Sequence, residues 1–405
     1  MYLKFAWRYF RAKHSANAIH IIAWITVGVI AFATCCQVLV LSVFNGFEDL
    51  VKSLYSSFYT DVRVVPEKGK TFVLSQDQIA LMKKLPTVEN FSLEAEEKAL
   101  LKNNETEAQT VVYLKGVDEN YPGVAGVAEK TTRGKYDLGT VDEPLLVAGA
   151  GIQNAVQFDI NFPGKLTVIL PKRNSNSNDP LESISEGNVE ASGTFSIQQE
   201  FDERYAITNI GFLKRQMGFT ADEYSAVEIK LRPKENVNDA VKQLKQVLGP
   251  DYKILTRYEQ NMSLYNTMRL EKWAIYGVLT LILIIAAFNM VSALTMLVLE
   301  KRKDISVLQC LGTTRAGILK IFLGEGLLLA AVGALAGIVM AVVLCLLQMK
   351  FRFIKLQGGS FLIDYFPVKI SSADLLLVAA TVSVIALIAA WFPSRKASKQ
   401  AFELR

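Results

Sequence analysis

Residues 273–299 read WAIYGVLTLILIIAAFNMVSALTMLVL, and this stretch decides the class of the protein because it holds no charged side chain. A helix rises about 1.5 Å per residue and the hydrocarbon core of a bilayer is about 30 Å thick, so roughly 20 apolar residues span it. The same criterion selects three more segments, and the expected spans are residues 19–44, 273–299, 318–348 and 374–392. The sequence therefore predicts an α-helical membrane protein with four transmembrane helices.

The composition of the chain is divided along its length. Of 405 residues, 51% are hydrophobic and 20% are charged, and nearly every long apolar run lies before residue 45 or after residue 272. Residues 45–272 carry most of the polar side chains, and a segment of about 225 residues can fold on an ordinary hydrophobic core. We expect a large mixed α/β domain here, inserted between spans 1 and 2. The four cysteines, at positions 35, 36, 310 and 345, lie in or beside the spans, so this domain holds no disulfide.

The first apolar segment has two alternative interpretations, a retained anchor or a cleaved signal. It is far longer than the roughly 7–15 apolar residues of a signal peptide, and no small-x-small cleavage site ends it. A lipoprotein-type cleavage site at Cys35 is a poor match, because Phe32-Ala33-Thr34 precedes it and the apolar run continues past it. We expect a retained transmembrane anchor.

Basic residues set the expected orientation, because cytoplasmic loops are enriched in Lys and Arg. An even number of spans places residues 1–18, 300–317 and 393–405 on one side of the membrane, and each of these segments is basic. We therefore expect these three segments in the cytoplasm. The loop 349–373 on the opposite side has a lower density of basic residues, at Lys350, Arg352, Lys355 and Lys369.

Residues 45–272 contain the patterns of both strands and helices. Strands are expected at residues 61–65, 109–114, 166–170 and 226–231, and helices at 76–84 and 236–248. An apolar stripe at helical spacing continues the first span outward as a stalk, which can face a ligand or pack on the outer domain. The stripe consists of Val40, Phe44, Phe47, Val51, Leu54 and Phe58. Residues 262–272 are expected to form a second stalk that leads into span 2.

A nearly all-polar segment interrupts the outer domain at residues 171–188, with NSNSNDP at residues 174–180. This composition is typical of an exposed loop, and exposed loops often carry binding residues. From composition alone it is either a connector or a contact for a partner.

The turn between spans 2 and 3 predicts a short amphipathic helix at the membrane surface. Ile305, Leu308 and Leu311 recur every three residues, Gly312 can end the helix, and Thr313 or Thr314 can cap the next one. Such a helix either transmits force from a cytoplasmic partner or only anchors the turn.

Span 3 contains GALAG at residues 333–337, a GxxxG pattern that lets two helix backbones approach closely. Glu325 lies about two turns into the same helix, and an ionisable group in a membrane segment suggests a function. The alternative for Glu325 is that it reaches the cytoplasmic surface or pairs with Lys320.

Enzymatic signatures are weak. The only histidines, His14 and His20, lie near the first span, so the outer domain has no histidine-based metal site or catalytic triad. Gly69-Lys70-Thr71 resembles the end of a phosphate loop, but the upstream glycine that the motif requires falls on Val64. We expect no catalytic residue, no metal and no cofactor in this chain, and no nucleic acid as a partner.

Three local sequences resemble a known permease family that includes the lipoprotein-releasing subunits LolC and LolE, the macrolide exporter MacB and the division protein FtsX. FAWRYFR at residues 5–11 resembles the family's N-terminal segment, and LSVFNGF at 41–47 resembles the LSVMNGF that closes the first span of lipoprotein-releasing permeases. AAFNMVSAL at 286–294, followed by Glu300-Lys301 and Leu311-Gly312, resembles their second span and coupling helix. The likeness covers essentially the whole chain. The tail PSRKASK at 393–399 departs from the family because the usual Asp-Pro is missing.

The resemblance implies a permease subunit of an ATP-driven ABC transporter in the inner membrane, which extracts lipoproteins and passes them to a periplasmic carrier. A cytoplasmic LolD-type ATPase would bind ATP and Mg, a second permease copy or a sister permease would complete the membrane part, and the carrier would be of LolA type. The implied coupling residues are Ile305, Leu308, Leu311 and Gly312. The implied lipid-access residues are Phe44, Phe47, Val51, Leu54, Tyr265 and Met268, and the implied carrier-binding residues are Pro171, Lys172, Arg173 and Pro180.

Two other interpretations remain open at this point. The same architecture suits an FtsX- or MacB-like mechanotransmission permease, which signals to periplasmic partners or drives efflux without extracting lipoproteins. It also suits a membrane-anchored receptor that has no ATPase.

Overall fold

The computed structural model describes residues 17–161, 164–172, 184–355 and 365–399, and it divides into two compact units. The helical unit contains the described residues up to 50 and from 266 onward. The α/β unit contains the described residues between 51 and 265. Each unit is described by itself.

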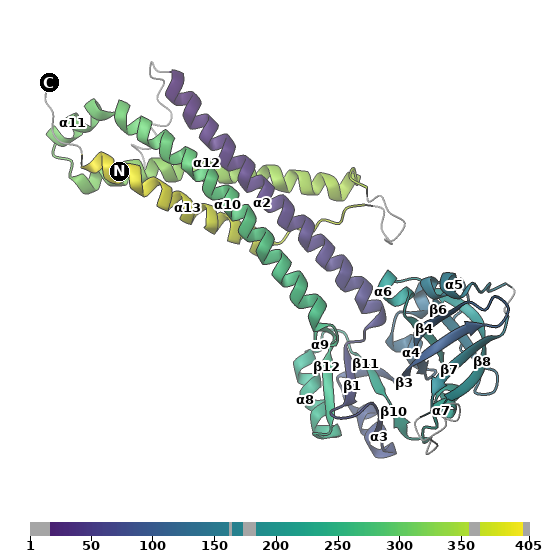
Figure 1. The fold of residues 1–405 in the computed structure, drawn as a ribbon. Helices are drawn as coiled ribbons and strands as arrows, with labels where there is room; N and C mark the ends of the chain where they lie inside the picture. The colour runs from purple at the N-terminus through teal and green to yellow at the C-terminus, as the bar shows by residue number, and fades with distance from the viewer. Residues whose placement is uncertain (1–16, 162–163, 173–183, 356–364, 400–405) are drawn as a thin grey trace. The chain divides into compact units, whose positions relative to one another are not determined.

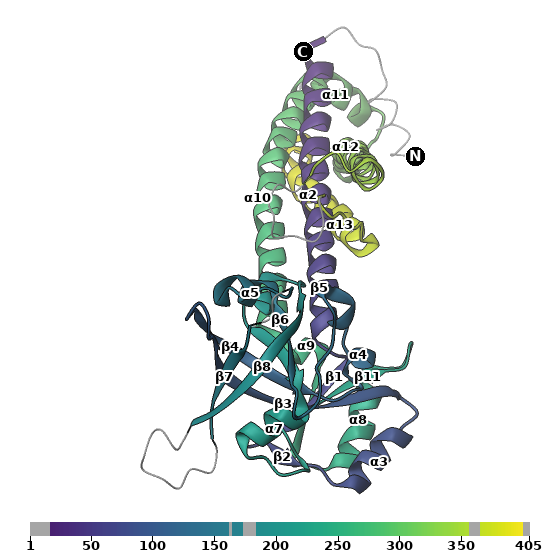
Figure 2. The ribbon, with the colours of Figure 1, turned by 90° about the vertical axis from the view of Figure 1, so that its right-hand side faces the viewer.

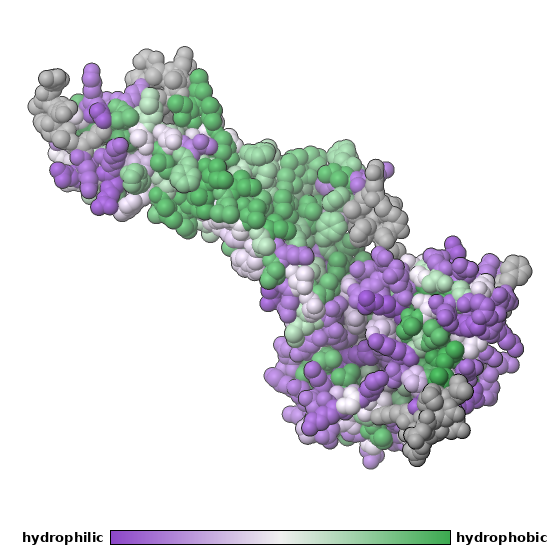
Figure 3. Space-filling view, viewed as in Figure 1, coloured by the Kyte–Doolittle hydropathy of each residue, from purple (hydrophilic) through white to green (hydrophobic). Residues whose placement is uncertain are grey.

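The helical unit is built from long apolar helices. Four helices are long and apolar enough to cross a membrane, and each expected span lies within one of them. These four helices are α2 (Asn17–Phe58), α10 (Met262–Glu300), α12 (Arg315–Phe351) and α13 (Ser372–Ser398), and the short helix α11 (Arg302–Cys310) connects α10 to α12. On the face drawn in Figure 3, hydrophobic residues cover most of these helices.

Small residues bring the long helices together. On α12, Gly333 and Gly337 lie against α2, and a Cβ atom at Gly337 would stand 2.4 Å from the carbonyl oxygen of Ala31. A Cβ atom at Gly326 would lie 2.6 Å from the Cβ of Ala390 on α13. The GxxxG pattern therefore marks a close helix crossing, as predicted, and Figure 1 shows α12 crossing α2.

Both stalk predictions are confirmed as helix continuations. α2 runs without interruption from the first span to Phe58, and α10 begins at Met262, ahead of the second span. Of the apolar stripe, Phe58 is buried in the α/β unit, where Val51 packs against the same cluster. Packing on the outer domain therefore accounts for these two residues of the stripe.

The α/β unit is organised around a ten-stranded sheet. Six of its strands pair in the closed order β3-β4-β9-β6-β8-β7-β3, which makes a small mixed barrel. The strands of the barrel are β3 (Val88–Asn103), β4 (Gln109–Val117), β6 (Leu145–Gly149), β7 (Leu166–Pro171), β8 (Ile184–Phe195) and β9 (Tyr205–Asn209). Side chains of α5 (Ala150–Val156) and α7 (Ile210–Met217) enter the barrel core.

A second lobe continues from the first half of β3. There β3 pairs with β11 (Ala226–Leu231), then β1 (Val62–Pro66) and β12 (Tyr252–Thr256) follow in order. Helices α3 (Gln76–Lys84) and α8 (Val237–Leu248) contribute to the core of this lobe. Ser75 and Asn236 cap the two helices with their side chains, so the predicted boundaries hold.

Short elements complete the unit. They are β2 (Phe72–Val73), α4 (Tyr121–Val124), the 3-10 turn Ala128–Lys130, β5 (Thr131–Gly134), α6 (Gln199–Asp202), β10 (Glu223–Tyr224) and α9 (Arg257–Gln260). The predicted strands at 61–65, 109–114, 166–170 and 226–231 correspond to β1, β4, β7 and β11.

Candidate functional site

The short helix α11 occupies the basic turn between α10 and α12. Gly312 follows it with a φ of +86°, a left-handed conformation that glycine adopts without strain, and the Thr313 N–H donates to the Leu308 carbonyl (3.0 Å). The Thr314 hydroxyl accepts from the Gly317 N–H (3.2 Å) and caps α12. The two helices are therefore delimited as the sequence predicted.

The expected apolar face of α11 needs a correction. Ile305 is only 2% exposed, so it cannot share an outward face with Leu311, which is 77% exposed. Ile305 points into a cluster with Val298, Ile318, Phe322 and Ala397. Since Ala397 lies in the last turn of α13 and Ile305 in the first turn of α11, the end of α13 packs near the start of α11.

The exposed apolar surface of α11 consists of other residues. Val307 and Leu311 are exposed and Leu308 is half-buried. Arg302 and Lys303, at the start of the helix, are exposed as well. This surface joins an apolar centre to a basic rim, the composition of a docking site for a protein partner with acidic residues.

The expected lipid-access residues divide between the two units. Phe44, Phe47 and Met268 belong to the helical unit, and all three are half-buried. Val51, Leu54 and Tyr265 belong to the α/β unit and are half-buried too. Within that unit Tyr265 packs on Tyr258, with ring centroids 5.0 Å apart, and the Lys52 amine lies 5.9 Å above its ring.

The polar segment at 171–188 includes the end of β7 and the start of β8, two strands that pair with each other. β7 and β8 pair antiparallel from Leu166 opposite Val189 to Pro171 opposite Ile184. Figure 2 shows the two strands running together to one edge of the α/β unit. Pro171 and Lys172 are exposed at the end of β7, whereas Arg173 and Pro180 lie outside the described residues.

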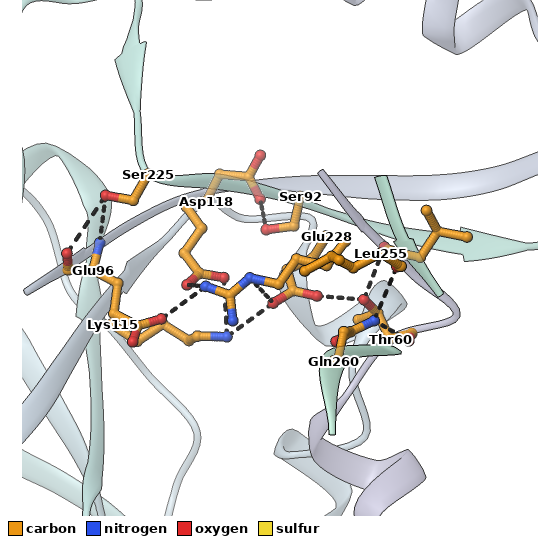
Figure 4. A network of polar contacts seen from close by, with 12 residues as sticks. Thr60, Ser92, Glu96, Lys115, Asp118, Ser225, Glu228, Leu255 and Gln260 are labelled. Atoms are coloured by element: carbon orange, nitrogen blue, oxygen red, sulfur yellow. Dashed lines mark hydrogen bonds and ion pairs between the residues drawn. The ribbon is translucent and has the colours of Figure 1, made fainter. Parts of the chain in front are cut away.

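A buried ionic network, which the sequence did not reveal, lies where α2 ends. Strand register sets one face of four strands: Arg63 stands opposite Glu228, and Lys115 opposite Glu96, with Glu94 two residues before Glu96. Arg63 Nη2 lies 2.8 Å from both Glu94 and Glu96, and Lys115 Nζ lies 2.9 Å from Glu94 and 3.1 Å from Glu228. Figure 4 shows Lys115 and Glu228 meeting inside the domain.

Burial and charge shape the ionisation of this network. Burial raises the pKa of Glu94 well above its ordinary value, against the attraction of Arg63 and Lys115. Burial acts in the same direction on Glu96 and Glu228, but the neighbouring cations lower the pKa of each to about 2. Three carboxyl groups thus share two cations, and burial opposes the charge on Glu94 more effectively than the charges on Glu96 and Glu228.

The network also holds the end of α2. The Thr60 hydroxyl donates to Glu228, and the Lys115 amine lies 5.0 Å above the ring of Phe58, the last residue of α2. Phe58 stacks on Phe201 with ring centroids 4.4 Å apart. The helix end is therefore fixed to the sheet by aromatic packing and by charge.

Other expected features are placed as follows. Glu325 is buried in the helical unit and does not reach the surface, and its Oε2 atom has no hydrogen-bond partner in the described part of the chain. Among the described residues, no group of three or more His, Cys, Asp and Glu side chains could hold a metal ion.

Comparison with known proteins decides the family. Residues 23–247 match the family model described as MacB-like periplasmic core domain, and residues 276–402 match the one described as FtsX-like permease C-terminal. The lipoprotein-releasing system transmembrane protein LolC of Xylella fastidiosa (strain 9a5c) is 24% identical over 97% of this chain and 95% of its own length. LolE of Haemophilus influenzae is 24% identical over 97% of this chain and 96% of its own. The chain belongs to the LolC/LolE family of MacB- and FtsX-like permeases.

A solved structure was matched as well. The periplasmic region of MacB from Actinobacillus actinomycetemcomitans covers 54% of this chain and 98% of its own, with 13% identity and a TM-score of 0.37. As a LolC/LolE-family member the chain is an ABC-transporter permease with four apolar helices, and its MacB-like domain lies between the first and second of them.

Proposed function

We propose that this permease extracts lipoproteins from the inner membrane and passes them to a periplasmic carrier of LolA type. The observation that carries the proposal is similarity along the whole chain, since relatives named as lipoprotein-releasing transmembrane proteins align with 97% of it. The similarity includes the outer domain as well as the helices that cross the membrane.

Lipoprotein release needs an energy source. Each buried acyl CH₂ holds about 0.8 kcal/mol, so a multi-chain lipid does not leave a bilayer spontaneously at a useful rate. A separate LolD-type ATPase chain that binds ATP and Mg would supply the work. A second copy of this chain or a sister permease would complete the membrane part.

The ATPase is expected to dock on the exposed surface of α11, which is formed by Val307, Leu308 and Leu311. Ile305 serves this site indirectly, because its burial against α12 and α13 holds α11 in place. A push on α11 would then reach both helices through one packed cluster.

The docking experiment compares two leucine variants of the full chain, coexpressed with its ATPase and purified in mild detergent. Leu311→Asp places a charge at the centre of the docking surface and should abolish recovery of the ATPase. Leu81→Asp changes an exposed leucine of α3 in the α/β unit and should leave recovery unchanged. Full ATPase recovery with Leu311→Asp would refute docking at this surface.

The lipid is expected to approach along Phe44, Phe47, Val51, Leu54, Tyr265 and Met268, and the β7–β8 hairpin is expected to meet the carrier. Half-buried aromatic and aliphatic residues suit acyl chains, and Lys172 is exposed beside the end of β7, where a soluble protein can reach it. Lys172→Glu at the end of β7 should weaken carrier capture without affecting ATPase recovery. Equal carrier capture by wild type and variant would contradict this assignment.

The FtsX-like match over residues 276–402 supports one competing function, a permease that signals to periplasmic partners without moving a substrate. Mass spectrometry of the purified complex separates the two. Acylated lipoproteins that copurify with the chain support release. A complex that carries the ATPase but never an acylated protein, even with ATP hydrolysis blocked, would favour signalling.

A further inference from the structure

The sequence Asn45-Gly46-Phe47 ends the LSVFNGF segment, and all three residues contact parts of the chain that are distant in sequence. Asn45 is buried on α2, and its Nδ2 donates to Asp374 Oδ2 of α13 (2.6 Å). Lys272 of α10 donates to Asn45 Oδ1 (2.8 Å) and to Asp374 Oδ2 (3.1 Å). These three side chains, which we call the clasp, join three helices.

Gly46 and Phe47 contact residues 365–371, which precede α13 and which we call the strap. A Cβ atom at Gly46 would stand 2.3 Å from the carbonyl oxygen of Pro367, so only glycine allows this approach. The ring of Phe47 packs edge-on against Phe366, with centroids 5.5 Å apart. The strap therefore lies directly on the backbone of α2.

Two further bonds fix the strap to α2. The Lys369 N–H donates to the carbonyl of Ser42 (2.9 Å), which uses the second lone pair of a helical carbonyl. The Lys369 amine lies 2.5 Å from Asp49. The strap thus follows α2 over about two helical turns, from Ser42 to Asp49.

The clasp lies at the boundary of the apolar segments. Asn45 follows the first expected span, Lys272 precedes the second, and Asp374 opens the fourth. The Lys272 and Asp374 side chains are only 28% and 15% exposed, so water screens their attraction weakly. A charge-assisted contact of this kind resists separation of the helices, because separation would leave the charges of Lys272 and Asp374 without a partner in a place that water reaches only in part.

We propose that the clasp and the strap make the outer ends of α2, α10 and α13 one mechanical body, with Asn45, Lys272 and Asp374 as positioning residues. α2 and α10 are unbroken helices that continue past this level toward the α/β unit. Helices that are connected here move together, so a displacement of α2 or α10 at one membrane face is transmitted along the helix without loss. The use of this motion for transport rests on the proposed function.

The rigid connection made by the clasp and the strap, which we call the joint, is tested first without ATP or lipoprotein. The full chain, with its four native cysteines replaced, is placed in lipid nanodiscs and spin-labelled at positions 270 and 376, on α10 and α13. Leu270 and Leu376 are 71% and 72% exposed, so labels disturb little. Double electron–electron resonance should give one narrow distribution of the distance between the two labels, and Asp374→Asn should broaden this distribution.

Two comparisons make this measurement specific. The exchanged pair Lys272→Asp with Asp374→Lys restores opposite charges and should narrow the distribution again. Glu271→Gln alters an exposed charge beside Lys272 and should change nothing. A distribution that stays narrow with Asp374→Asn overturns the joint, whatever the outcome of the transport assays.

The second test distinguishes a permanent joint from a latch that opens during transport. Cysteines at positions 45 and 374, in the assembled transporter with its ATPase, are joined by a short bifunctional reagent. A permanent joint predicts that the linked transporter keeps its lipoprotein release per ATP, whereas Asp374→Asn hydrolyses ATP but loses release. Loss of release on linking would overturn the proposal, and absence of any release by wild type would overturn the proposed function alone.

Discussion

Replacing Gly46 with alanine gives a quantitative test of the strap. The added methyl group would stand 2.3 Å and 2.4 Å from the carbonyl oxygen and carbon of Pro367, and 2.6 Å from the Val368 nitrogen. All three atoms belong to the backbone, so no side chain can rotate away and the strap itself must move. Overpacking of this kind costs about 1–3 kcal/mol, and loss of the Lys369–Ser42 hydrogen bond costs about 1 kcal/mol more.

A gain in helix propensity opposes this cost. Alanine in place of a helical glycine stabilises a helix by about 0.5–1 kcal/mol, so the net loss for Gly46→Ala is about 1–3 kcal/mol. Gly28 provides the matched control, because it lies on the same helix and a Cβ atom there would meet nothing within 4 Å. Gly28→Ala should therefore stabilise the chain by about 0.5–1 kcal/mol.

The assay combines global and local measurements on the full chain in detergent. Thermal unfolding should shift in opposite directions for the two variants, downward for Gly46→Ala and upward for Gly28→Ala. Hydrogen exchange at the Lys369 amide should accelerate in Gly46→Ala alone, because that amide is bonded to α2. Shifts of the same sign, or unchanged protection of Lys369, would refute the close approach of the strap.

The remaining predictions concern the ionic network and the helix crossing. Because burial raises the pKa of Glu94, its proton stabilises the fold most below the ordinary carboxyl pKa, and this contribution is lost as the pH rises through the folded value. Glu94→Gln keeps a neutral group at every pH. The free energy of unfolding in urea should therefore fall less for the variant than for wild type as the pH rises above the ordinary carboxyl pKa. Lys115→Met leaves buried carboxylates without their cation and should lower the local stability of β4, measured by hydrogen exchange, by about 3–5 kcal/mol. A loss below about 1 kcal/mol would contradict a stabilising role of the ionic network. Gly337→Val should separate α12 from α2 and lower the thermal midpoint, whereas Gly277→Val, with open space around its Cβ, should lower it far less. Lys115→Met and Asp374→Asn lie on different attachments of α2, so their stability losses should add, whereas their losses of transport per ATP should not.

Local patterns predicted the elements whose signals are local. The boundaries of α3 and α8 follow from a capping serine at Ser75, a capping asparagine at Asn236 and apolar periodicity between cap and stop. The spans followed from length and hydrophobicity alone. These properties are read within one segment and do not depend on which other segment packs against it.

Barrel closure could not be predicted in this way. β3 has 16 residues, and its last four pair with β7. Three of these four, Leu100, Leu101 and Lys102, also pair with β4. Nothing in the sequence of β3 indicates that it pairs with two strands at this end. Its partners are separated from it by long stretches of chain, and pairing over such distances is set by the whole core.

The candidate docking site shows the same limit at smaller scale. Ile305 and Leu311 are both large apolar residues of one short turn, and helical spacing placed them on one face. The structure buries Ile305 because Ile318 and Ala397 approach from other helices, and it leaves Leu311 and Val307 exposed. Which apolar residue is covered depends on tertiary contacts that an isolated helix does not encode.

The ionic network was missed for a related reason. Glu94 and Glu96 alternate along β3 as charges do on a solvated strand face, and Lys115 fits the same description on β4. Only the register, which sets Glu96 opposite Lys115 and Arg63 opposite Glu228, brings the opposite charges together under the end of α2. Among the predicted strands, only Arg63 at 61–65 and Glu228 at 226–231 carried charges of this network, because no strand was predicted over Glu94 and Glu96 and Lys115 lies just past the strand predicted at 109–114.

The two attachments of α2 meet a requirement of the mechanical role that we propose for this helix. A helix transmits a displacement only if its contacts at each end yield less than the helix itself, and close-packed or charge-paired contacts yield little. Within the helical unit Asn45 ties α2 to Lys272 and Asp374, and within the α/β unit Phe58 stacks on Phe201 under the Lys115 amine. Between these levels α2 has no proline and no break. In the proposed mechanism, the Asn45-Gly46-Phe47 sequence therefore marks the point at which α2 is fixed to α10 and α13.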